Sequence, residues 1–309
     1  MKKFKIASTV VAGAMFLSVA GNALALNTKA DVIFVMDESG SMSGEQEWLI
    51  GMATNLESSL NAAGVTSTRF GVVGFGTSGH GTPIYQEAHQ HTFNGSEWGT
   101  ASAIGSNMSP SFTASGGYED GWQAIDYALN NYSIRSDAAL NIVLITDENR
   151  DGDISSSPGY NLDYSDVLAE LTSRNALLNA VVLADLFDGN GDSALGVDSA
   201  KDSYLADGSG GFSKVEGGGT AVNEFNSDTT VEDYVELAWA SGGAAWDLNQ
   251  LRAGGLTAAS FTAAFVDIKV DEIVNQEPSG EVPEPATMLL FGTGLAGLAG
   301  VSRRRKMKN

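Results

Sequence analysis

The sequence predicts an α/β protein with a doubly wound, mostly parallel central sheet and helices on both faces. Short apolar runs rich in β-branched residues, which are typical of buried parallel strands, occupy 30–37, 69–75, 138–146 and 177–184. Stretches of helical length separate these runs, and strands that alternate with helices form parallel sheets. The roughly 255 residues between the two ends of the chain are enough to bury one large core.

The elements follow in regular order from the first strand. This strand leads into a helix over 43–63, in which Trp48, Leu49, Met52, Leu56 and Leu60 recur at helical spacing. A further strand is expected at 83–93, and further helices are expected at 121–132, 164–174, 231–240, 246–251 and 256–268. Two segments rich in Gly, Asp and Ser interrupt the rhythm, and we expect them to be surface insertions at 151–161 and about 185–229.

Residues 1–25 have the order of a secretory signal peptide. Lys2, Lys3 and Lys5 precede an apolar run from Ile6 to Ala20, and the small-residue exit Ala23-Leu24-Ala25 follows it. A buried N-terminal helix does not explain why the charges gather at the start and the small residues at the end. We therefore expect an exported protein whose mature form begins at Leu26.

The other end carries a motif, an apolar segment and a basic cluster. A linker over 272–281 precedes Val282-Pro283-Glu284-Pro285, the charge-free segment 286–302 and the arginines and lysines of 303–308. Seventeen helical residues reach about 25 Å, slightly short of a hydrocarbon core of about 30 Å, so this transmembrane segment is marginal. The basic cluster places the C-terminus in the cytoplasm.

This tail, 282–309, resembles the PEP-CTERM sorting signal of Gram-negative bacteria, in which motif, span and arginine cluster occur in the same order. The resemblance implies recognition by an exosortase, transient anchoring in the inner membrane, removal of the tail and delivery to the cell surface or the extracellular space. A permanent membrane anchor is the alternative.

Composition restricts the class of partner. The chain carries 17 basic and 38 acidic residues, and eight of the basic ones lie in the two end segments. The mature protein is therefore strongly acidic, which disfavours nucleic acid and anionic lipid and attracts divalent cations. Cysteine is absent, so the exported domain has no disulfides and depends on its core, on metal, or on both.

The residues that indicate chemistry stand at the ends of two strands. Asp37-Glu38-Ser39-Gly40-Ser41 follows the first strand, and Asp147 follows the strand over 138–146. Ligands of doubly wound sheets bind at the carboxyl ends of strands, and an aspartate with two hydroxyls around a tight turn suits Mg²⁺, or Mn²⁺ or Ca²⁺. A simple turn with a helix cap is the alternative for the first motif.

At these residues the chain resembles the von Willebrand factor type A family, whose metal-ion-dependent adhesion site combines an Asp-x-Ser-x-Ser loop with an Asp after a later strand. The resemblance covers a domain at 29–271 and implies that Asp37, Ser39, Ser41 and Asp147 bind the metal. It also requires a ligand from a distant loop, where Tyr118 stands in place of a common threonine. Ser115 is the matching residue, with Thr113 or Glu119 as alternatives.

Two acidic strings and a histidine pair offer weaker signals. The strings beginning at Asp147 and Asp188 have the oxygen spacing of a calcium loop, but Pro158 and Ser199 stand where its final Glu belongs, so acidic loops are favoured over weak calcium sites. We interpret His89 and His91 as surface or edge residues, because the adjacent sequence contains no carboxylate or cysteine in a metal-binding pattern.

The sequence contains no nucleophile elbow, zinc-protease helix, phosphate loop or cysteine nucleophile. We therefore expect a binding protein rather than an enzyme, one that attaches to a protein or an acidic polysaccharide through its metal. A metal-assisted hydrolase of matrix polymer would need a general base such as Glu38, Glu119 or Asp120 beside the metal. A structural matrix component in which metal serves as a folding staple is the other alternative.

Overall fold

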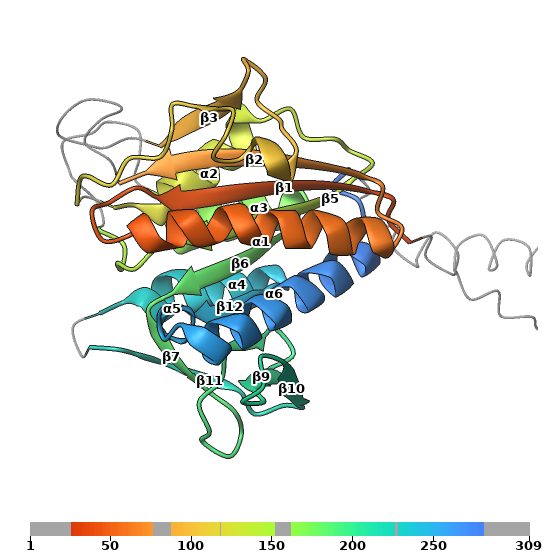
Figure 1. Cartoon of the computed structure of the whole chain (residues 1–309). Helices are drawn as coiled ribbons and strands as arrows, with labels where there is room; N and C mark the ends of the chain where they lie inside the picture. Colours follow the sequence, from red (N-terminus) through yellow and green to blue (C-terminus); the bar gives the residue numbers. More distant parts are fainter. Residues whose placement is uncertain (1–25, 77–87, 118, 152–161, 226–227, 281–309) are drawn as a thin grey trace, which may run out of the picture.

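A large mixed sheet forms the centre of the molecule. The computed structural model describes residues 26–76, 88–117, 119–151, 162–225 and 228–280. Within these residues ten strands form one sheet in the order β10-β9-β8-β12-β6-β5-β1-β2-β3-β4 (Figure 1). The expected signal peptide, the sorting tail and the segment 286–302 lie outside the described residues. No described helix is both long enough and apolar enough to cross a bilayer.

Five neighbouring strands of this sheet are parallel. They are β12 (Ala244–Asp247), β6 (Ala176–Val182), β5 (Ala139–Ile145), β1 (Lys29–Asp37) and β2 (Ser67–Phe75). Their carboxyl ends therefore share one edge of the sheet. The fold class predicted from the alternation of strands and helices is confirmed.

The central strand β1 is buried on both faces. Val32, Phe34 and Met36 belong to one core cluster, whereas Ile33 and Val35 belong to the other. Successive side chains of a strand point to opposite faces, so an uninterrupted apolar run requires helices on both sides.

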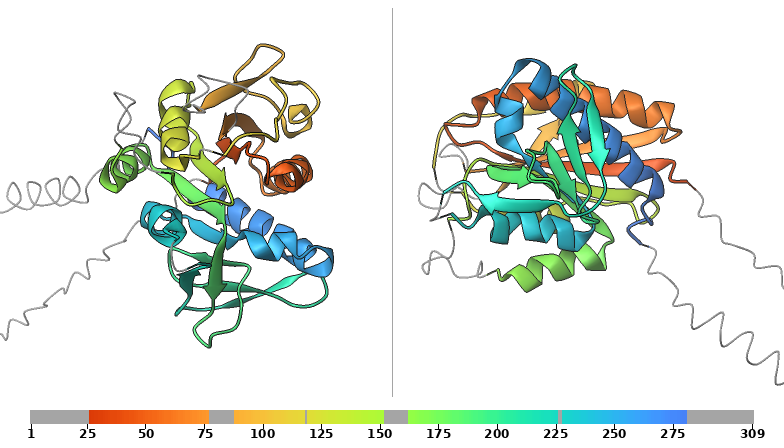
Figure 2. Two further views of the ribbon diagram at one scale, coloured as in Figure 1. Left: turned by 90° about the vertical axis from the view of Figure 1, so that its left-hand side faces the viewer. Right: turned by 90° about the horizontal axis from the view of Figure 1, so that it is seen from below.

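Helices cover both faces. On one face α1 (Ser43–Ala62) and α6 (Gly255–Asn275) lie side by side, with α5 (Leu248–Arg252) at their end (Figure 1). On the opposite face lie α2 (Gly121–Asn131), α3 (Tyr164–Ser173) and α4 (Glu236–Ser241), as both views of Figure 2 show. A π-helical turn, Val231–Val235, precedes α4, and a short 3-10 helix, Ala101–Ala103, lies between β3 and β4.

Shorter strands extend the sheet at both edges. Beyond β2 come β3 (His89–Phe93) and β4 (Met108–Ser109), both antiparallel to their neighbours. Beyond β12 come β8 (Gly196–Asp198), β9 (Ser203–Ala206) and β10 (Phe212–Val215), also antiparallel. A separate two-stranded sheet pairs β7 (Ala184–Phe187) with β11 (Thr220–Asn223).

The segment 185–229, which the sequence predicts to be a surface insertion, contains most of five short strands. Tyr204 of β9 is buried and stacks on Trp246 of β12 at a centroid distance of 5.8 Å, which attaches this segment to the core. Asp198 and Asp207 close tight turns by accepting backbone N–H bonds from residues two and four positions later. Strands of three or four residues between such turns are too short to show a hydrophobic period.

The two ends of the described domain meet at the amino edge of β1. The backbone N–H of Asn27 donates to the carbonyl of Val274 at 3.3 Å, close to the end of α6. The polar residues that follow β1 and β5 lie at the opposite edge of the sheet, so this edge faces away from the chain ends.

Candidate metal centre

Asp37 lies at the carboxyl edge of the sheet, where its carboxylate accepts several hydrogen bonds. Asp37 is the last residue of β1 and is fully buried. Its Oδ1 accepts the backbone N–H of Ser39 at 2.7 Å, and its Oδ2 accepts the hydroxyl of Thr146 at 2.8 Å. Thr146 directly follows the neighbouring parallel strand β5, so the register of β1 and β5 brings the two residues together.

Hydroxyl groups connect this end of β1 to Asp147. Ser39 Oγ lies 3.1 Å from Ser41 Oγ, and Ser41 Oγ donates to Asp147 Oδ1 at 2.9 Å. The turn over 38–42 that holds both serines leads directly into α1. The two strand-end motifs, 106 residues apart in the chain at Ser41 and Asp147, therefore share one site.

A third carboxylate, that of Glu119, completes a cluster. One carboxylate oxygen from each of Asp37, Glu119 and Asp147 lies within 4.8 Å of the others. Reciprocal bonds hold Glu119 in place: its N–H donates to Asp151 Oδ2 at 2.7 Å, and the N–H of Asp151 donates to its carbonyl at 2.8 Å. Gly76 leaves room for the cluster, because a Cβ there would lie 2.8 Å from Asp37 Oδ1 and 2.9 Å from Glu119 Cγ.

The loop that contains the other two candidate ligands is fastened to Glu38. The N–H of Thr113 donates to Glu38 Oε1 and the N–H of Ser115 donates to the Glu38 carbonyl, both at 3.0 Å. Ser115 is exposed, whereas Glu119 is buried beside Asp37. Of the three candidates for the distant ligand, Glu119 is thus the one whose carboxylate lies in the cluster, and its role as a ligand stays a prediction.

The electrostatics of the cluster require a proton or a cation. Burial raises the pKa of Asp37 to about 7, despite the hydrogen bonds from Ser39 and Thr146. Burial and the nearby charge of Asp37 raise the pKa of Glu119 to about 9. The ionisation of Asp37 and Glu119 is therefore disfavoured unless a further positive charge joins the cluster. Glu119 Oε2 is also buried without a hydrogen-bond partner among the described residues.

Carboxylates and hydroxyls are the hard oxygen donors that Mg²⁺, Mn²⁺ and Ca²⁺ prefer. The residues present therefore fit a divalent cation, which would be held by Asp37, Ser39, Ser41, Asp147 and Glu119. A cation there would also remove the repulsion among the three carboxylates.

Arg252 stands next to the cluster and was not expected from the sequence. Its Nε donates to Glu45 Oε1 and its second guanidinium nitrogen donates to Asp147 Oδ2, both at 2.8 Å. Arg252 ends α5, and no local pattern links it to residues more than 100 positions away. A positive charge beside the candidate metal is notable in a chain with so few basic residues.

The second acidic string supports the interpretation as an acidic loop. Asp188 Oδ1 accepts the backbone N–H groups of Asn190 and Asp192, both at 2.8 Å. Its other oxygen accepts the side-chain amide of Asn190 at 3.1 Å. Both carboxylate oxygens of Asp188 thus bond within their own turn, as in turns closed by aspartate.

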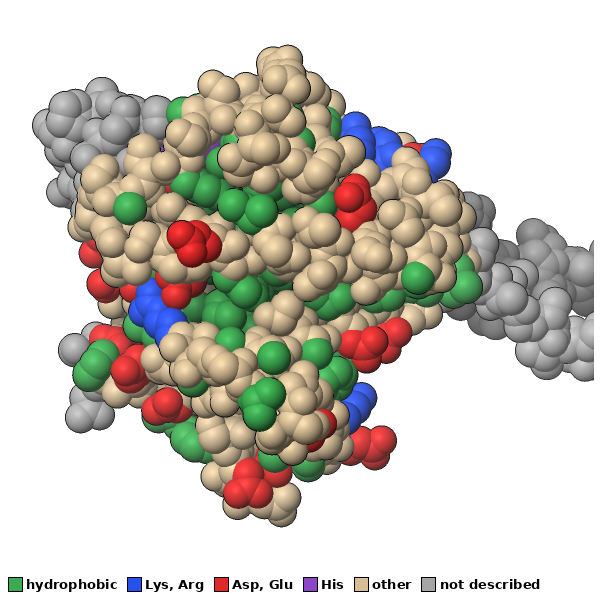
Figure 3. Space-filling model, viewed as in Figure 1, with side chains coloured by type: hydrophobic (Ala, Val, Ile, Leu, Met, Phe, Trp, Pro, Cys, Tyr) green, Lys and Arg blue, Asp and Glu red, His purple; other side chains and the backbone are tan. Residues whose placement is uncertain are grey.

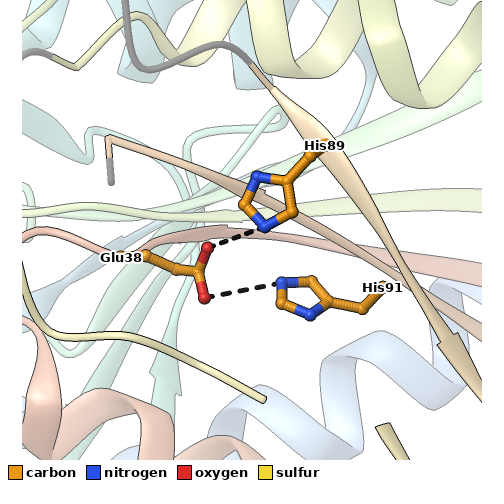
Figure 4. Close-up of side chains that lie close together, drawn as sticks. All are labelled: Glu38, His89 and His91. Carbon is orange, nitrogen blue, oxygen red and sulfur yellow. Dashed lines mark ion pairs between the residues drawn. The ribbon is translucent and has the colours of Figure 1, made fainter. Parts of the chain in front are cut away.

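The interpretation of His89 and His91 as surface or edge residues is wrong. Both lie against Glu38, as Figure 4 shows: His89 Nε2 is 3.0 Å from Glu38 Oε2, and His91 Nε2 is 3.5 Å from Glu38 Oε1. Glu38 and His91 are fully buried. The carboxylate comes from the end of β1, about 50 residues away in the chain, so no local sequence pattern contains it.

Comparison with known proteins identifies two segments. Residues 31–196 match the family model of the von Willebrand factor type A domain, and residues 281–306 match that of the PEP-CTERM protein-sorting motif. Among curated proteins, none matches.

Solved structures with a similar fold include two of proximal thread matrix protein 1 from the mussel byssus. Their sequences are 15% and 16% identical to this chain, with TM-scores of 0.33 and 0.35. Each alignment covers 51% of this chain and 37% of the mussel protein. The second structure is described as having a zinc-occupied MIDAS motif. The pilus adhesin SpaC of Lactobacillus rhamnosus GG is 14% identical, with a TM-score of 0.42 over 80% of this chain and 30% of the adhesin. The alignments thus span about a third of each of these proteins.

Proposed function

The chain belongs to the von Willebrand factor type A domain family, and from this premise we propose that it is an exported binding protein whose partner contacts a divalent cation held at Asp37. The sorting motif at 281–306 directs export across the inner membrane and delivery to the cell surface or extracellular space of a Gram-negative bacterium. The same motif implies processing by an exosortase. We infer that the tail anchors the precursor in the inner membrane only until it is cut.

One observation carries the proposal: three carboxylates and two serine hydroxyls converge at the carboxyl edge of the parallel strands. Asp37, Glu119 and Asp147 supply the carboxylates, and Ser39 and Ser41 supply the hydroxyls. Mg²⁺, the ion we expect at this edge, commonly keeps coordination positions for water or substrate. An acidic group of a partner would replace one such water.

Arg252 supports an acidic partner. Its guanidinium pairs with Asp147 and stays about one-third exposed. An acidic partner that reaches the metal would therefore meet a second positive charge beside it. A carboxylate from a protein fits this arrangement, and so does a uronate of an acidic polysaccharide. Acidic side chains outnumber basic ones on the face seen in Figure 3, which disfavours nucleic acid as the partner.

We favour binding over hydrolysis because the candidate bases have other contacts. Glu38 is buried between His89 and His91 and accepts the N–H of Thr113. Asp120 caps α2 and forms an ion pair with Arg150 at 2.9 Å. Glu119, with its pKa raised to about 9 by burial and its acidic neighbours, lies within the cluster that would hold the metal.

The test is capture of partners from the native envelope by the full-length chain, in Mg²⁺ and in chelator. The double variant Ser39→Ala/Ser41→Ala removes two hydroxyl ligands, and Ser58→Ala is the matched control, because Ser58 is exposed on α1. We expect the wild type and Ser58→Ala to retain a partner only in Mg²⁺, and the double variant to retain none while its circular dichroism is unchanged.

Other outcomes would separate the alternatives. Equal Mg²⁺ affinity in the double variant and the wild type would contradict the site. A large loss of thermal stability in chelator, without any saturable partner, would support a structural staple. Turnover of an envelope polysaccharide that requires Mg²⁺ would support the hydrolase.

A further inference from the structure

We propose that Glu38, His89 and His91 form a second metal site, which takes Zn²⁺ or a similar transition-metal ion. One ligand atom from each of the three side chains lies within 4.8 Å of the others. Figure 4 shows both rings directed at the two oxygens of the same carboxylate. The site is separate from the cluster at Asp37, although Glu38 is the next residue in the chain.

The contacts of His91 favour a metal over a simple hydrogen bond. His91 Nδ1 lies 2.6 Å from the carbonyl oxygen of Pro110, which can only accept a hydrogen bond, so Nδ1 carries the N–H. In the neutral ring Nε2 is then an acceptor, and it faces Glu38 Oε1, also an acceptor, at 3.5 Å. Nε2 has no hydrogen-bond partner among the described residues. Metal-binding histidines commonly donate their other N–H to a backbone carbonyl in this way.

The spacing of the ligand atoms suits a tetrahedral ion. With bonds of about 2.0 to 2.1 Å, neighbouring ligands of a tetrahedral Zn²⁺ lie about 3.3 Å apart. The two distances from ring nitrogens to Glu38 oxygens, 3.0 Å to Oε2 and 3.5 Å to Oε1, lie on either side of this value, and one ligand atom from each residue lies within 4.8 Å of the others. Small movements of the side chains would therefore be enough to admit the ion.

The strand between the ligands leaves room for the site. Gly74 of β2 pairs with Met36 of β1 on one side and with His89 of β3 on the other. A Cβ at Gly74 would lie 2.2 Å from Glu38 Oε2 and 2.7 Å from His91 Nε2. The missing side chain thus allows a carboxylate from the end of β1 to reach two histidines across β2.

The donor set differs from that of the cluster at Asp37. Two imidazole nitrogens and one carboxylate are typical of Zn²⁺ sites with an open fourth position, whereas an all-oxygen set suits Mg²⁺. His89 is 17% exposed, and Glu38 and His91 are fully buried, so solvent can approach from one side. We therefore assign different metals to the two sites.

A metal at Glu38 would brace the candidate binding site. The Glu38 side chain accepts the N–H of Thr113, and its carbonyl accepts the N–H of Ser115. Glu38 thus ties the loop over 113–115 to the turn that follows Asp37. A bound ion would fix Glu38 and, through it, the relative position of these two segments.

The test uses the full-length chain, stripped of metal and then kept in excess Mg²⁺, which competes with Zn²⁺ at the all-oxygen cluster but poorly at the histidine site. Zn²⁺ affinity is measured against a chromophoric chelator, and Co²⁺ is added as a spectroscopic probe of tetrahedral geometry. We expect one equivalent of Zn²⁺ and a tetrahedral Co²⁺ spectrum. Removing a residue that only supports a metal ligand lowers metal affinity by about 10- to 100-fold. His91→Ala and His89→Ala each remove a ligand itself, so we expect their Zn²⁺ affinity to fall by at least about 100-fold.

Two controls make the result specific. Thr92→Ala changes the same strand without a ligand and should bind Zn²⁺ as the wild type does. Ser39→Ala/Asp147→Ala damages the cluster at Asp37 and should also keep its Zn²⁺, so failure of one site is distinguishable from failure of the other. If His91→Ala does not fold, as judged by circular dichroism, His91→Gln replaces it.

Two outcomes would overturn the proposal. One is a wild type that binds no stoichiometric Zn²⁺ in excess Mg²⁺. The other is a folded histidine variant that binds Zn²⁺ as tightly as the wild type. In either case Glu38 would be a buried carboxylate that pairs with the two histidine side chains without a metal.

Discussion

Replacement of Glu119 by glutamine should make the metal-free protein more stable and weaken its binding of Mg²⁺. Glutamine keeps the size of the side chain and, like a protonated carboxyl group, offers a hydrogen-bond donor. It removes the ionisable group that burial and the neighbouring carboxylates hold in its neutral form. The two effects have opposite signs, so they cannot both arise from general damage to the fold.

The size of the stabilisation follows from the pKa of Glu119, which rises from 4.5 to about 9 in the folded protein. At pH 7 the unfolded chain has lost this proton and the metal-free folded chain retains it. Each pH unit between 4.5 and 7 costs about 1.4 kcal/mol, so the free energy of unfolding is lowered by on the order of 3 kcal/mol. Because the folded pKa is raised, this penalty is absent below pH 4.5 and grows as pH rises towards 9.

Urea and thermal melts of chelator-treated protein at pH 4.5 and pH 7 measure the effect. At pH 7 Glu119→Gln should raise the melting temperature by about 6 to 12 °C, and at pH 4.5 it should change it little. Glu148→Gln is the matched control, because Glu148 is exposed next to the same cluster, and surface substitutions change stability by about 0.5 kcal/mol or less. Titration calorimetry at pH 7 should show Mg²⁺ affinity lost in Glu119→Gln and kept in Glu148→Gln.

Unchanged stability and unchanged Mg²⁺ affinity in Glu119→Gln would refute the reasoning. Glu119 would then lie outside the metal site, and the hydroxyl of Ser115 would become the preferred distant ligand. Stabilisation without any loss of Mg²⁺ affinity would show that the carboxylate is buried beside the metal but does not bind it.

Three further predictions concern other parts of the molecule. Arg252→Gln removes a positive charge that pairs with Asp147, so the Mg²⁺ affinity measured by calorimetry should rise. The rise should be about fivefold or less, because the ion pair is partly exposed. A lower Mg²⁺ affinity would show that Arg252 helps to build the site. Asp31 is buried and pairs with Arg69 and Arg135, so Asp31→Ala should lower the free energy of unfolding in urea melts by about 3–5 kcal/mol. The exposed Asp137→Ala should lower it by almost nothing, and equal losses in the two variants would contradict a special role for Asp31. Replacement of residues 283–285 by alanines should leave unprocessed precursor in the inner-membrane fraction. Tail removal would be contradicted if the intact mass of the extracellular wild-type protein still includes the basic cluster of 303–308.

The local pattern of β1 was sufficient to predict the central architecture. Residues 30–36 of this strand are all buried. Alternate apolar side chains enter two separate cores. An apolar run of this kind is stable only inside a parallel sheet with helices on both faces. The ends of the strands are also visible in the sequence, because acidic and hydroxyl residues replace the apolar run at Asp37 and, after β5, at Thr146 and Asp147. This change of residue type led to the prediction that Asp37 and Asp147 are neighbours.

The tertiary structure decided which distant residues join these strand ends. The choice among Thr113, Ser115 and Glu119 depends on the course of a loop. Two hydrogen bonds, one to the side chain of Asp151 and one from its backbone N–H, determine the position of Glu119. No periodicity records such bonds, because their partners are more than 30 residues apart in the chain.

The sequence by itself determined the fold class, the exported character and the candidate ligands at the strand ends, because each depends on a short stretch of chain. Only the tertiary structure decided that His89 and His91 meet Glu38. That contact depends on the strand order β1-β2-β3 and on the missing side chain of Gly74 between them. Strand order follows from the packing of the whole core, so residues that meet across a strand leave no signal in their own neighbourhoods.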